Sequence, residues 1–398
     1  MIIDTLPESD KCFGCGACEQ ICSCGAIRMY SDSEGFLISI VDTNHCTRCN
    51  LCVQVCPVLT QNRDSIMNMP KRVYAARNKD PVTLMHSTSG AIFSVFAKEI
   101  LSKGGVVYGC AWTDKNMTAT HIRVDHEQDL HRLLHSKYVQ STTDQTFRNV
   151  QSDLSRNMSV LFSGTPCQIA GLRLFLRKEY AGLLTIDLLC HGVPSPTMLS
   201  AYVASLVRKE HIPIHDLKFR DKKSSGFRAY VSYSRSNGNR RFRLAGSEPY
   251  LYGFYREYFN RESCYSCPFK QYQRAGDITL ADYWGLELHH PELKGWLRYG
   301  ASLCLFNTKN GLNWEVTFKK LAEYVESRIE YAAEKNPALN TRHDFNHRPD
   351  LRGIIYRELH EHGFDWIAAR YMRPRFAWLH YMVPAFVKNI LRSFRRNN

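Results

Sequence analysis

The sequence predicts an α+β multidomain protein with a small cysteine-rich N-terminal module, an α/β core carrying an antiparallel β extension, and a helical C-terminal tail. Three observations lead to this class. A chain of 398 residues is too long for one ordinary hydrophobic core. Cysteines are concentrated in residues 1–60. From about residue 71 onwards, strand-like and helix-like patterns alternate, as they do in α/β proteins.

The N-terminal module at residues 1–60 lacks long periodic segments, so bound metal rather than apolar packing is expected to hold it together. A polar stretch at residues 61–71 is predicted to be a linker. The α/β core is predicted at residues 72–300. Residues 301–398 are predicted to form a helical region that ends in a basic amphipathic tail.

Within the core, short apolar runs alternate with segments of helical periodicity. Strands or buried apolar runs are expected at residues 71–77, 105–112, 118–124, 159–163 and 183–190, and helices at residues 89–101, 127–134, 143–156, 166–177 and 197–209. Farther along, Leu217–Phe219 precedes two strand-like runs, Tyr230–Arg235 and Arg241–Leu244, which flank the turn residues Ser236-Asn-Gly238. This pattern predicts the antiparallel β extension.

The tail has an amphipathic helical pattern from Pro384 onwards. Its apolar face consists of Phe386, Val387, Ile390, Leu391 and Phe394, and the basic residues off that face are Lys388, Arg392, Arg395 and Arg396. Such a helix docks on a membrane surface or on a partner protein. The alternative is a terminal helix folded against the core.

Two four-cysteine runs lie in the N-terminal module: Cys12-x2-Cys15-x2-Cys18-x3-Cys22 and Cys46-x2-Cys49-x2-Cys52-x3-Cys56-Pro57. This spacing is typical of bacterial two-cluster ferredoxins, in which the fourth cysteine of each run serves the other cluster. One [4Fe-4S] cluster is therefore assigned to Cys12, Cys15, Cys18 and Cys56, and the other to Cys46, Cys49, Cys52 and Cys22. The module is thus predicted to be ferredoxin-like, and the alternative is a set of free or zinc-bound cysteines.

Local residues support this reading with one departure. Gly14 and Gly16 would let the backbone wrap closely around a cluster, with amide N–H groups directed at the sulfurs. Ser23 stands where two-cluster ferredoxins usually have proline. Cys24 is interpreted as an extra thiol rather than a ligand. The chain has 15 cysteines, and an odd, tightly spaced set favours metal ligation over disulfides.

Four further cysteines predict a third site. Cys167 lies at a strand-to-helix turn, where the helix N-terminus favours an anionic sulfur. Cys190 ends a buried strand, and Cys264 and Cys267 form a Cys-x2-Cys pair. We interpret the four as ligands of a third [4Fe-4S] cluster. A four-cysteine zinc site and unrelated buried thiols are the alternatives. Cys110 and Cys304 are expected to be core thiols.

Charge and composition exclude some functions. The formal net charge is +14, yet residues 1–60 hold seven acidic and three basic residues, and residues 366–398 hold seven basic residues and no acidic one. This distribution indicates an electron-transfer module and a basic tail, with no nucleic-acid partner. Without a signal peptide or a long apolar stretch, the protein is expected to be cytoplasmic, with peripheral contact at the inner membrane face through the tail.

Six further motifs resemble the coenzyme F420 hydrogenase/dehydrogenase beta subunit family over residues 71–290. They are His86-Ser-Thr-Ser-Gly90, Lys137-Tyr-Val-Gln-Ser141, Gly164-Thr-Pro-Cys-Gln168, Cys190-His-Gly-Val-Pro-Ser195, Cys264-x2-Cys267-Pro268 and Gly276-Asp-Ile-Thr-Leu-Ala-Asp-Tyr-Trp-Gly285. A fused ferredoxin domain is common in that family. Ala91 and Ala281 depart from the family pattern, because glycine is frequent at both positions.

The resemblance implies a flavin, most simply FAD, bound in the α/β core beside the third cluster. It also implies cofactor-binding roles for Ser87, Thr88, Ser89, Gly90, Lys137, Gly164 and Thr165. Lys137 near the flavin would stabilise its reduced anion, and His191 would tune the cluster or relay a proton.

Each of these positions has a purely structural alternative. Ser87–Gly90 could serve only as a helix cap, Lys137 could be a surface lysine, and His191 could simply pack. Asp277 and Asp282 are interpreted as structural turn residues.

Three functions are compatible with these features. The first is an iron–sulfur flavoprotein oxidoreductase, in which clusters exchange electrons with a flavin that exchanges hydride with an organic substrate or coenzyme. Its partner would be a redox protein or a reduced coenzyme. The second is a non-catalytic electron-transfer subunit that docks on a partner enzyme. The third, a cluster-based DNA-binding sensor, is disfavoured because no helix-turn-helix is recognisable.

Overall fold

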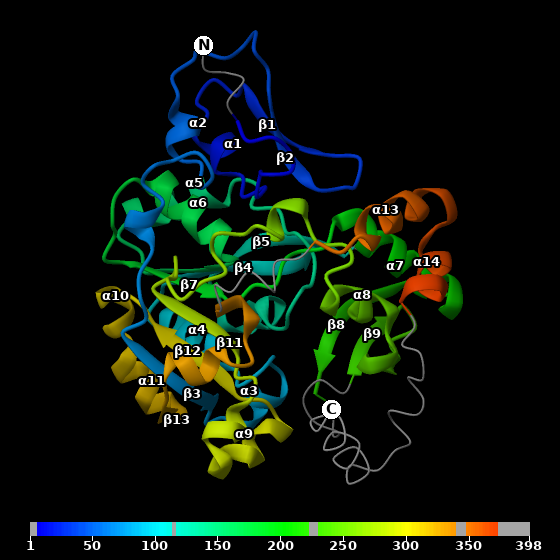
Figure 1. Cartoon of the computed structure of the whole chain (residues 1–398). Helices are drawn as coiled ribbons and strands as arrows, with labels where there is room; N and C mark the ends of the chain where they lie inside the picture. Colours follow the sequence, from blue (N-terminus) through cyan, green and yellow to red (C-terminus); the bar gives the residue numbers. More distant parts are fainter. Residues whose placement is uncertain (1–5, 114–116, 223–229, 340–347, 373–398) are drawn as a thin grey trace, which may run out of the picture.

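The computed structural model describes residues 6–113, 117–222, 230–339 and 348–372. These residues form a two-stranded, a three-stranded and an eight-stranded sheet. Figure 1 shows the N-terminal module at one end of the molecule, above the central sheet, and the three-stranded sheet at one side. The mixed α/β class predicted from the sequence is therefore confirmed. The tail pattern that begins at Pro384 lies outside the described residues.

The N-terminal module contains an antiparallel hairpin of β1 (Ile27–Ser31) and β2 (Leu37–Val41) and two short helices, α1 (Ala17–Ile21) and α2 (Leu51–Gln54). Both helices begin directly after a residue in the left-handed conformation, Gly16 with φ 78° and Asn50 with φ 60°. The left-handed residue reverses the chain just before each helix, so each cysteine run curls around one point.

The central sheet has the strand order β13-β3-β12-β11-β7-β6-β4-β5. The strands are β3 (Arg72–Asn78), β4 (Val106–Thr113), β5 (Thr118–Val124), β6 (Val160–Gly164), β7 (Leu183–Leu188), β11 (Ile278–Asp282), β12 (Ser302–Phe306) and β13 (Ala322–Glu326). The four inner strands β4, β6, β7 and β11 run parallel, whereas the flanking strands pair antiparallel. Apolar side chains alternate between the two faces, as a sheet buried on both faces requires.

Helices cover both faces of this sheet. Helices α4 (Ile92–Ser102) and α11 (Glu315–Leu321) pack on one face, and α5 (Thr146–Ser155) and α6 (Pro166–Leu176) pack on the other. Helix α6 starts with a capping box between Thr165 and Gln168 and with Pro166 at its first turn. This well-defined start places Cys167 at the helix N-terminus, next to the carboxyl end of β6.

Two features differ from the sequence expectation. Strands β12 and β13 flank β3 in the central sheet, although the sequence predicts a helical region from residue 301 onwards. All five residues of β12 are buried, and a short, uniformly apolar run does not distinguish a strand from a helix. In addition, the helix expected at residues 127–134 is a 3₁₀ helix, η3 (Glu127–Leu133).

The antiparallel extension comprises β8 (Ile214–Asp221), β9 (Tyr230–Arg235) and β10 (Arg240–Leu244). It shares an aromatic-rich core with α7 (Pro196–Glu210), α8 (Pro249–Tyr255), α13 (Leu351–His362) and α14 (Phe364–Tyr371). Figure 1 shows this group of elements beside the central sheet. No helix in the described ranges is long and apolar enough to cross a membrane.

Candidate redox centres

The structure brings together the four cysteines that the spacing assigns to the first cluster. Cys12, Cys15, Cys18 and Cys56 line one cavity of about 340 Å³ and are each less than 10% exposed. We call this group the inner site. Burial, reinforced by neighbouring thiolate charge, raises the pKa of Cys18 to about 12 and that of Cys56 to about 11. Iron must displace these protons, so binding would be coupled to deprotonation.

The second group, the outer site, lies nearer the surface. Cys46 and Cys52 pack with the buried Cys22, while Cys49 is exposed. Burial raises the pKa of Cys52, and the charges of Cys49 and Cys46 act in the same direction. The outer site therefore offers the solvent-accessible edge of the module.

The two runs have the same local geometry. In the first run, the N–H of Gly14 donates to Cys12 Sγ at 3.3 Å, and in the second the N–H of Arg48 donates to Cys46 Sγ at 3.4 Å. Gly14 and Arg48 both have positive φ angles, 63° and 58°. The repeat in sequence is thus a repeat in backbone conformation, in which an amide N–H points at the first sulfur of each run.

Cys24, interpreted as an extra thiol, lies beside the outer site. Its Sγ is 3.6 Å from Cys22 Sγ. Backbone N–H groups of Thr47 and Ala26 lower the pKa of this exposed thiol to about 7.

The four remaining predicted ligands, Cys167, Cys190, Cys264 and Cys267, line a second cavity of about 600 Å³, which we call the core site. Cys167 belongs to α6, Cys190 follows β7, and the other two come from the loop that starts at the 3₁₀ helix η5 (Glu262–Cys264). Burial raises the pKa of all four thiols, to about 11 for Cys167 and about 12 for Cys190. Within the described residues, no three His, Cys, Asp or Glu side chains are spaced to hold a single metal ion.

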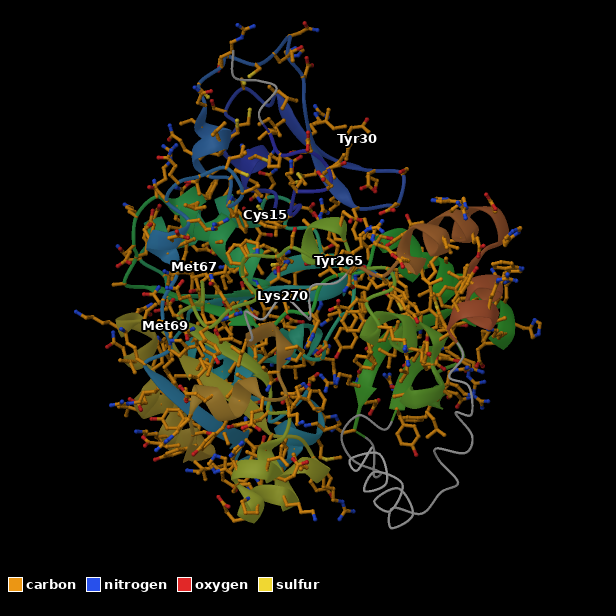
Figure 2. All side chains as sticks on the ribbon, in the orientation of Figure 1. Cys15, Tyr30, Met67, Met69, Tyr265 and Lys270 are labelled. Atoms are coloured by element: carbon orange, nitrogen blue, oxygen red, sulfur yellow. The ribbon has the colours of Figure 1, made fainter. Side chains whose placement is uncertain are left out.

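The inner site and the core site are neighbours. Phe13 and Gly14 line both cavities. Cys15 packs against α6, where a Cβ added at Gly171 would lie 3.0 Å from Cys15 Sγ. Figure 2 shows Cys15 at the junction of the N-terminal module with the core, and Lys270 farther into the core. Lys270 lines the core site.

A buried polar network holds the Cys264–Cys267 loop against β7. Arg274, which is 1% exposed, donates from Nη1 to the carbonyl oxygen of Phe269 at 2.9 Å and from Nη2 to that of Leu188 at 2.9 Å. Its charge is balanced by Asp187 on β7, with the Arg274 Nη2 and Asp187 Oδ2 atoms 3.4 Å apart. The loop cysteines and Cys190 are therefore positioned from the same strand.

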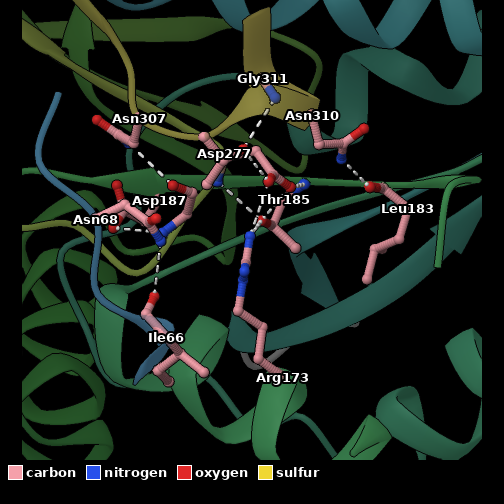
Figure 3. Close-up of polar contacts among 12 residues, drawn as sticks. Ile66, Asn68, Arg173, Leu183, Thr185, Asp187, Asp277, Asn307, Asn310 and Gly311 are labelled. Atoms are coloured by element: carbon pink, nitrogen blue, oxygen red, sulfur yellow. Dashed lines mark hydrogen bonds and ion pairs between the residues drawn. The ribbon is translucent and has the colours of Figure 1, made fainter. Parts of the chain in front are cut away.

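Asp277 is a second node of this network, shown in Figure 3. It accepts hydrogen bonds from Arg173 Nη2 at 2.8 Å, Thr185 N at 2.9 Å and Thr308 Oγ1 at 2.6 Å. These contacts tie α6 to β7 and to the segment after β12. Asp277 thus joins three segments of the core through its carboxylate. Asp282 pairs with Arg220 at 2.5 Å.

The Ser87–Gly90 turn is docked on the central sheet. Ser89 Oγ donates to the carbonyl oxygen of Ala301 at 2.9 Å, and Gly90 N donates to Ser302 Oγ at 2.9 Å. Thr88 Oγ1 accepts from Ser136 N at 3.2 Å. Ser87 Oγ, in a residue 3% exposed, has no hydrogen-bond partner within the described residues. Ala91 has φ 60°, which explains why glycine suits this position.

The other predicted cofactor residues are dispersed. Lys137 Nζ donates to the carbonyl oxygens of Arg132, Leu134 and His135 at 2.9–3.3 Å, and burial lowers the pKa of Lys137 to about 8. Thr165 lines the core site instead, with its Oγ1 3.1 Å from Cys167 Sγ, and Gly164 precedes it as the last residue of β6. Burial lowers the pKa of His191 to about 4, and the Lys270 charge adds to this, so the imidazole is neutral at pH 7.

The sequence gives no sign of three buried cations near these sites: Arg261, Arg274 and Lys222 are each at most 2% exposed. Each of them has a polar or charged neighbour in the sequence, and such a context usually indicates a solvated loop. Lys222 Nζ donates to the Ser89 carbonyl oxygen at 2.6 Å, and its burial lowers its pKa to about 7.

The fold and the paired cysteine runs define an iron–sulfur protein. Residues 157–327 match the family described as the C terminus of the coenzyme F420 hydrogenase/dehydrogenase beta subunit, and residues 11–59 match the 4Fe-4S dicluster domain. Residues 157–327 therefore belong to the C-terminal family of the coenzyme F420 hydrogenase/dehydrogenase beta subunit, and residues 11–59 form a 4Fe-4S dicluster ferredoxin domain. A dicluster domain implies two [4Fe-4S] clusters.

Two curated proteins are similar to this chain over part of its length. The F subunit of F420H2 dehydrogenase from Methanosarcina mazei is 24% identical over 197 residues, which are 46% of this chain and 54% of that protein. Coenzyme F420-dependent sulfite reductase of Methanocaldococcus jannaschii is 23% identical over 219 residues, 54% of this chain and 33% of that protein. The chain thus matches about half of the first and a third of the second.

A chain from the F420-reducing [NiFe] hydrogenase complex of Methanosarcina barkeri is similar in structure. The TM-score is 0.46 at 15% identity, covering 71% of this chain and 89% of that chain.

Proposed function

We propose that the protein is an iron–sulfur flavoprotein oxidoreductase that passes electrons between three [4Fe-4S] clusters and FAD, which exchanges hydride with an organic substrate or coenzyme. The observation that carries this proposal is the core site, where four cysteines from three separate segments line one cavity beside the inner site. Thiolates are the usual ligands of such clusters, so the donor set fits a third one.

The exposure of the cysteines gives the three sites an order. Cys49 of the outer site is exposed, all four cysteines of the inner site are buried, and the core site adjoins the inner site. The outer site would therefore be the contact for a redox partner protein. The inner site would pass electrons between the outer site and the core site within the same chain.

Of the residues predicted to contact a flavin, Thr165 lines the core site, whereas Ser87–Gly90 and Lys137 do not line it. The buried, unpartnered hydroxyl of Ser87 is available to a cofactor, while Thr88, Ser89 and Gly90 hold the turn in place. When bound, a flavin exchanges electron pairs with organic molecules and single electrons with clusters. Gly164 and Thr165 would position the cofactor against Cys167. Lys137 would supply positive charge, and His191, which is neutral at pH 7, would tune the cluster at the core site.

A second candidate function is that of an electron-transfer subunit without a substrate of its own. The match with the sulfite reductase supports it, because the shared part is only 33% of that enzyme and 54% of this chain. A segment shared in this way is suited to delivering electrons to different catalytic partners.

Anaerobic purification with iron, sulfide and flavin quantified per chain tests the proposal. The expected content is about twelve iron atoms and one flavin, four irons for each cluster. Cys190→Ser should lower the iron content to about eight, whereas the matched control Cys304→Ala, at a buried cysteine of β12, should leave it unchanged.

Turnover then separates the two candidates. Reduction of the bound flavin by reduced coenzyme F420 or a nicotinamide coenzyme would support the oxidoreductase. Full cofactor content with electron transfer only to or from an added partner protein would favour the second candidate. A content of about eight iron atoms with no flavin in the unmodified protein would contradict the three-cluster flavoprotein.

A further inference from the structure

Arg261 lies between the inner site and the core site. It comes three residues before Cys264 and is 2% exposed. Its Nε donates to the carbonyl oxygen of Cys12 at 2.6 Å, which anchors the side chain to the inner site. The same residue lines the core cavity together with the four core-site cysteines. A Cβ added at Gly14 would lie 2.9 Å from Arg261 Nη1, so the guanidinium also contacts the shared wall of the two cavities.

The terminal nitrogens of this guanidinium are unpaired. Neither Nη1 nor Nη2 has a hydrogen-bond partner among the residues that the structure describes. The guanidinium also lies over the ring of Phe36, with the ring centroid 5.4 Å from the guanidinium carbon. A buried charge with unsatisfied donors is strongly unfavourable unless an anion compensates it. The side chain therefore has the chemistry of an anion-binding group directed into a cavity.

We propose that Arg261 is a positioning residue that donates hydrogen bonds from Nη1 and Nη2 to the anionic cluster held at the core site, and so raises its reduction potential. This inference rests on the proposed third cluster. Anionic sulfur is the complementary partner, because cation–anion hydrogen bonds are the strong ones.

The direction of the effect follows from charge. One-electron reduction adds a negative charge to the cluster, so a fixed positive charge stabilises the reduced form more than the oxidised form. Hydrogen bonds to cluster sulfur are among the influences that set cluster potentials. A core site of raised potential beside the inner site would accept electrons from it readily.

The test is a redox titration of the full-length protein with all its cofactors bound, using dithionite as the one-electron reductant and following the clusters by electron paramagnetic resonance. Arg261→Met should lower the reduced-to-oxidised ratio of the core cluster at least tenfold at a given potential, which is a shift of about 59 mV for a one-electron couple. Arg261→Lys keeps the charge and should recover part of that shift. The core signal is identified as the one lost in Cys190→Ser.

Ser263→Ala is the matched control. Ser263 Oγ donates to the same Cys12 carbonyl oxygen at 2.9 Å but carries no charge, so this variant should leave the core potential unchanged. An unchanged core potential in Arg261→Met, or an equal shift in Ser263→Ala, would overturn the inference while leaving the third cluster intact. Absence of the third cluster from the unmodified protein would instead remove the proposed function itself.

Discussion

Gly14 is a position at which close packing around the N-terminal module can be tested directly. It has φ 63° and its N–H donates to Cys12 Sγ. A Cβ at this position would overlap Gln140 Nε2 and come within 2.5 Å of the Leu37 carbonyl oxygen. Gly25 has a similar φ of 67°, yet a Cβ there would meet nothing within 4 Å. The pair separates backbone strain from steric overlap.

The two effects can be estimated separately. A non-glycine residue in the left-handed conformation costs about 1–2 kcal/mol, and both Gly14→Ala and Gly25→Ala incur it. Overpacking adds about 1–3 kcal/mol, and only Gly14→Ala incurs that, because the Leu37 carbonyl oxygen is backbone and cannot rotate away. We therefore expect the free energy of unfolding to fall by about 1–2 kcal/mol in Gly25→Ala and by about 2–5 kcal/mol in Gly14→Ala.

Anaerobic urea unfolding followed by circular dichroism would measure the difference, from the midpoints at a common slope. Iron content should fall in Gly14→Ala as well, because the same substitution displaces an amide that points at Cys12 Sγ. Equal midpoints and equal iron contents for the two variants would refute the close packing around Gly14.

Two further predictions concern buried charge and protonation. Asp277→Asn should lower the free energy of unfolding by about 3 kcal/mol, because it leaves the Arg173 guanidinium without its ion partner. The control Asp64→Asn, at an exposed residue, should change the free energy of unfolding by less than about 0.5 kcal/mol. Equal losses in the two variants would contradict the estimate. His121 is 5% exposed, stacks on Phe162, and has its pKa lowered by burial to about 4. As pH falls from about 6.5 to about 4 the unfolded chain takes up a proton that the folded chain does not, so stability is lost through that window, by up to about 3 kcal/mol. The acid limb of a stability–pH curve should be shallower in His121→Gln by that amount, and parallel curves would contradict this assignment.

The sequence predicted those parts of the fold that local patterns encode. The alternating run at residues 118–124 is β5, and the apolar run at residues 159–163 lies within one residue of β6. It did not predict that β12 and β13 join the central sheet. Their partner is β3, with Cys304 opposite Tyr74 and Val325 opposite Ala75, more than two hundred residues apart in sequence. Periodicity reports which face of an element is buried, but it does not report its partner.

Some features of the candidate site could likewise be predicted from the sequence and others could not. Cysteine spacing alone indicated which residues meet at the inner site, because the reach of a short loop limits the choice. The family resemblance already implied a cofactor contact for Ser87, which stays a prediction. Nothing in the sequence marks Arg261, an arginine that is 2% exposed. The proposed roles in cofactor binding or catalysis stay predictions for Lys137, Gly164, Thr165 and His191.

The N-terminal module is bound to the core through polar groups that define a single geometry. Gln20 of α1, 2% exposed, accepts from the Phe147 amide at 2.7 Å and donates to Thr143 Oγ1 at 3.2 Å. Thr143 Oγ1 in turn donates to the carbonyl oxygen of Cys15 at 2.9 Å, so a cluster ligand is itself part of the interface. On the other side, Arg352 forms a two-pronged ion pair with Glu34.

These contacts fix the position of the inner site relative to the core site. Buried hydrogen bonds to backbone atoms have narrow geometric tolerance, and an unmade one is costly, so sliding of the module over α6 is opposed at several points at once. Cys15 and Ala17 also pack into the same apolar cluster as α5 and α6. The module is therefore packed tightly against the core, and these contacts set the spacing between the inner and core sites. Electron exchange between those two sites would consequently be insensitive to ionic strength, unlike exchange with an external partner at the exposed outer site.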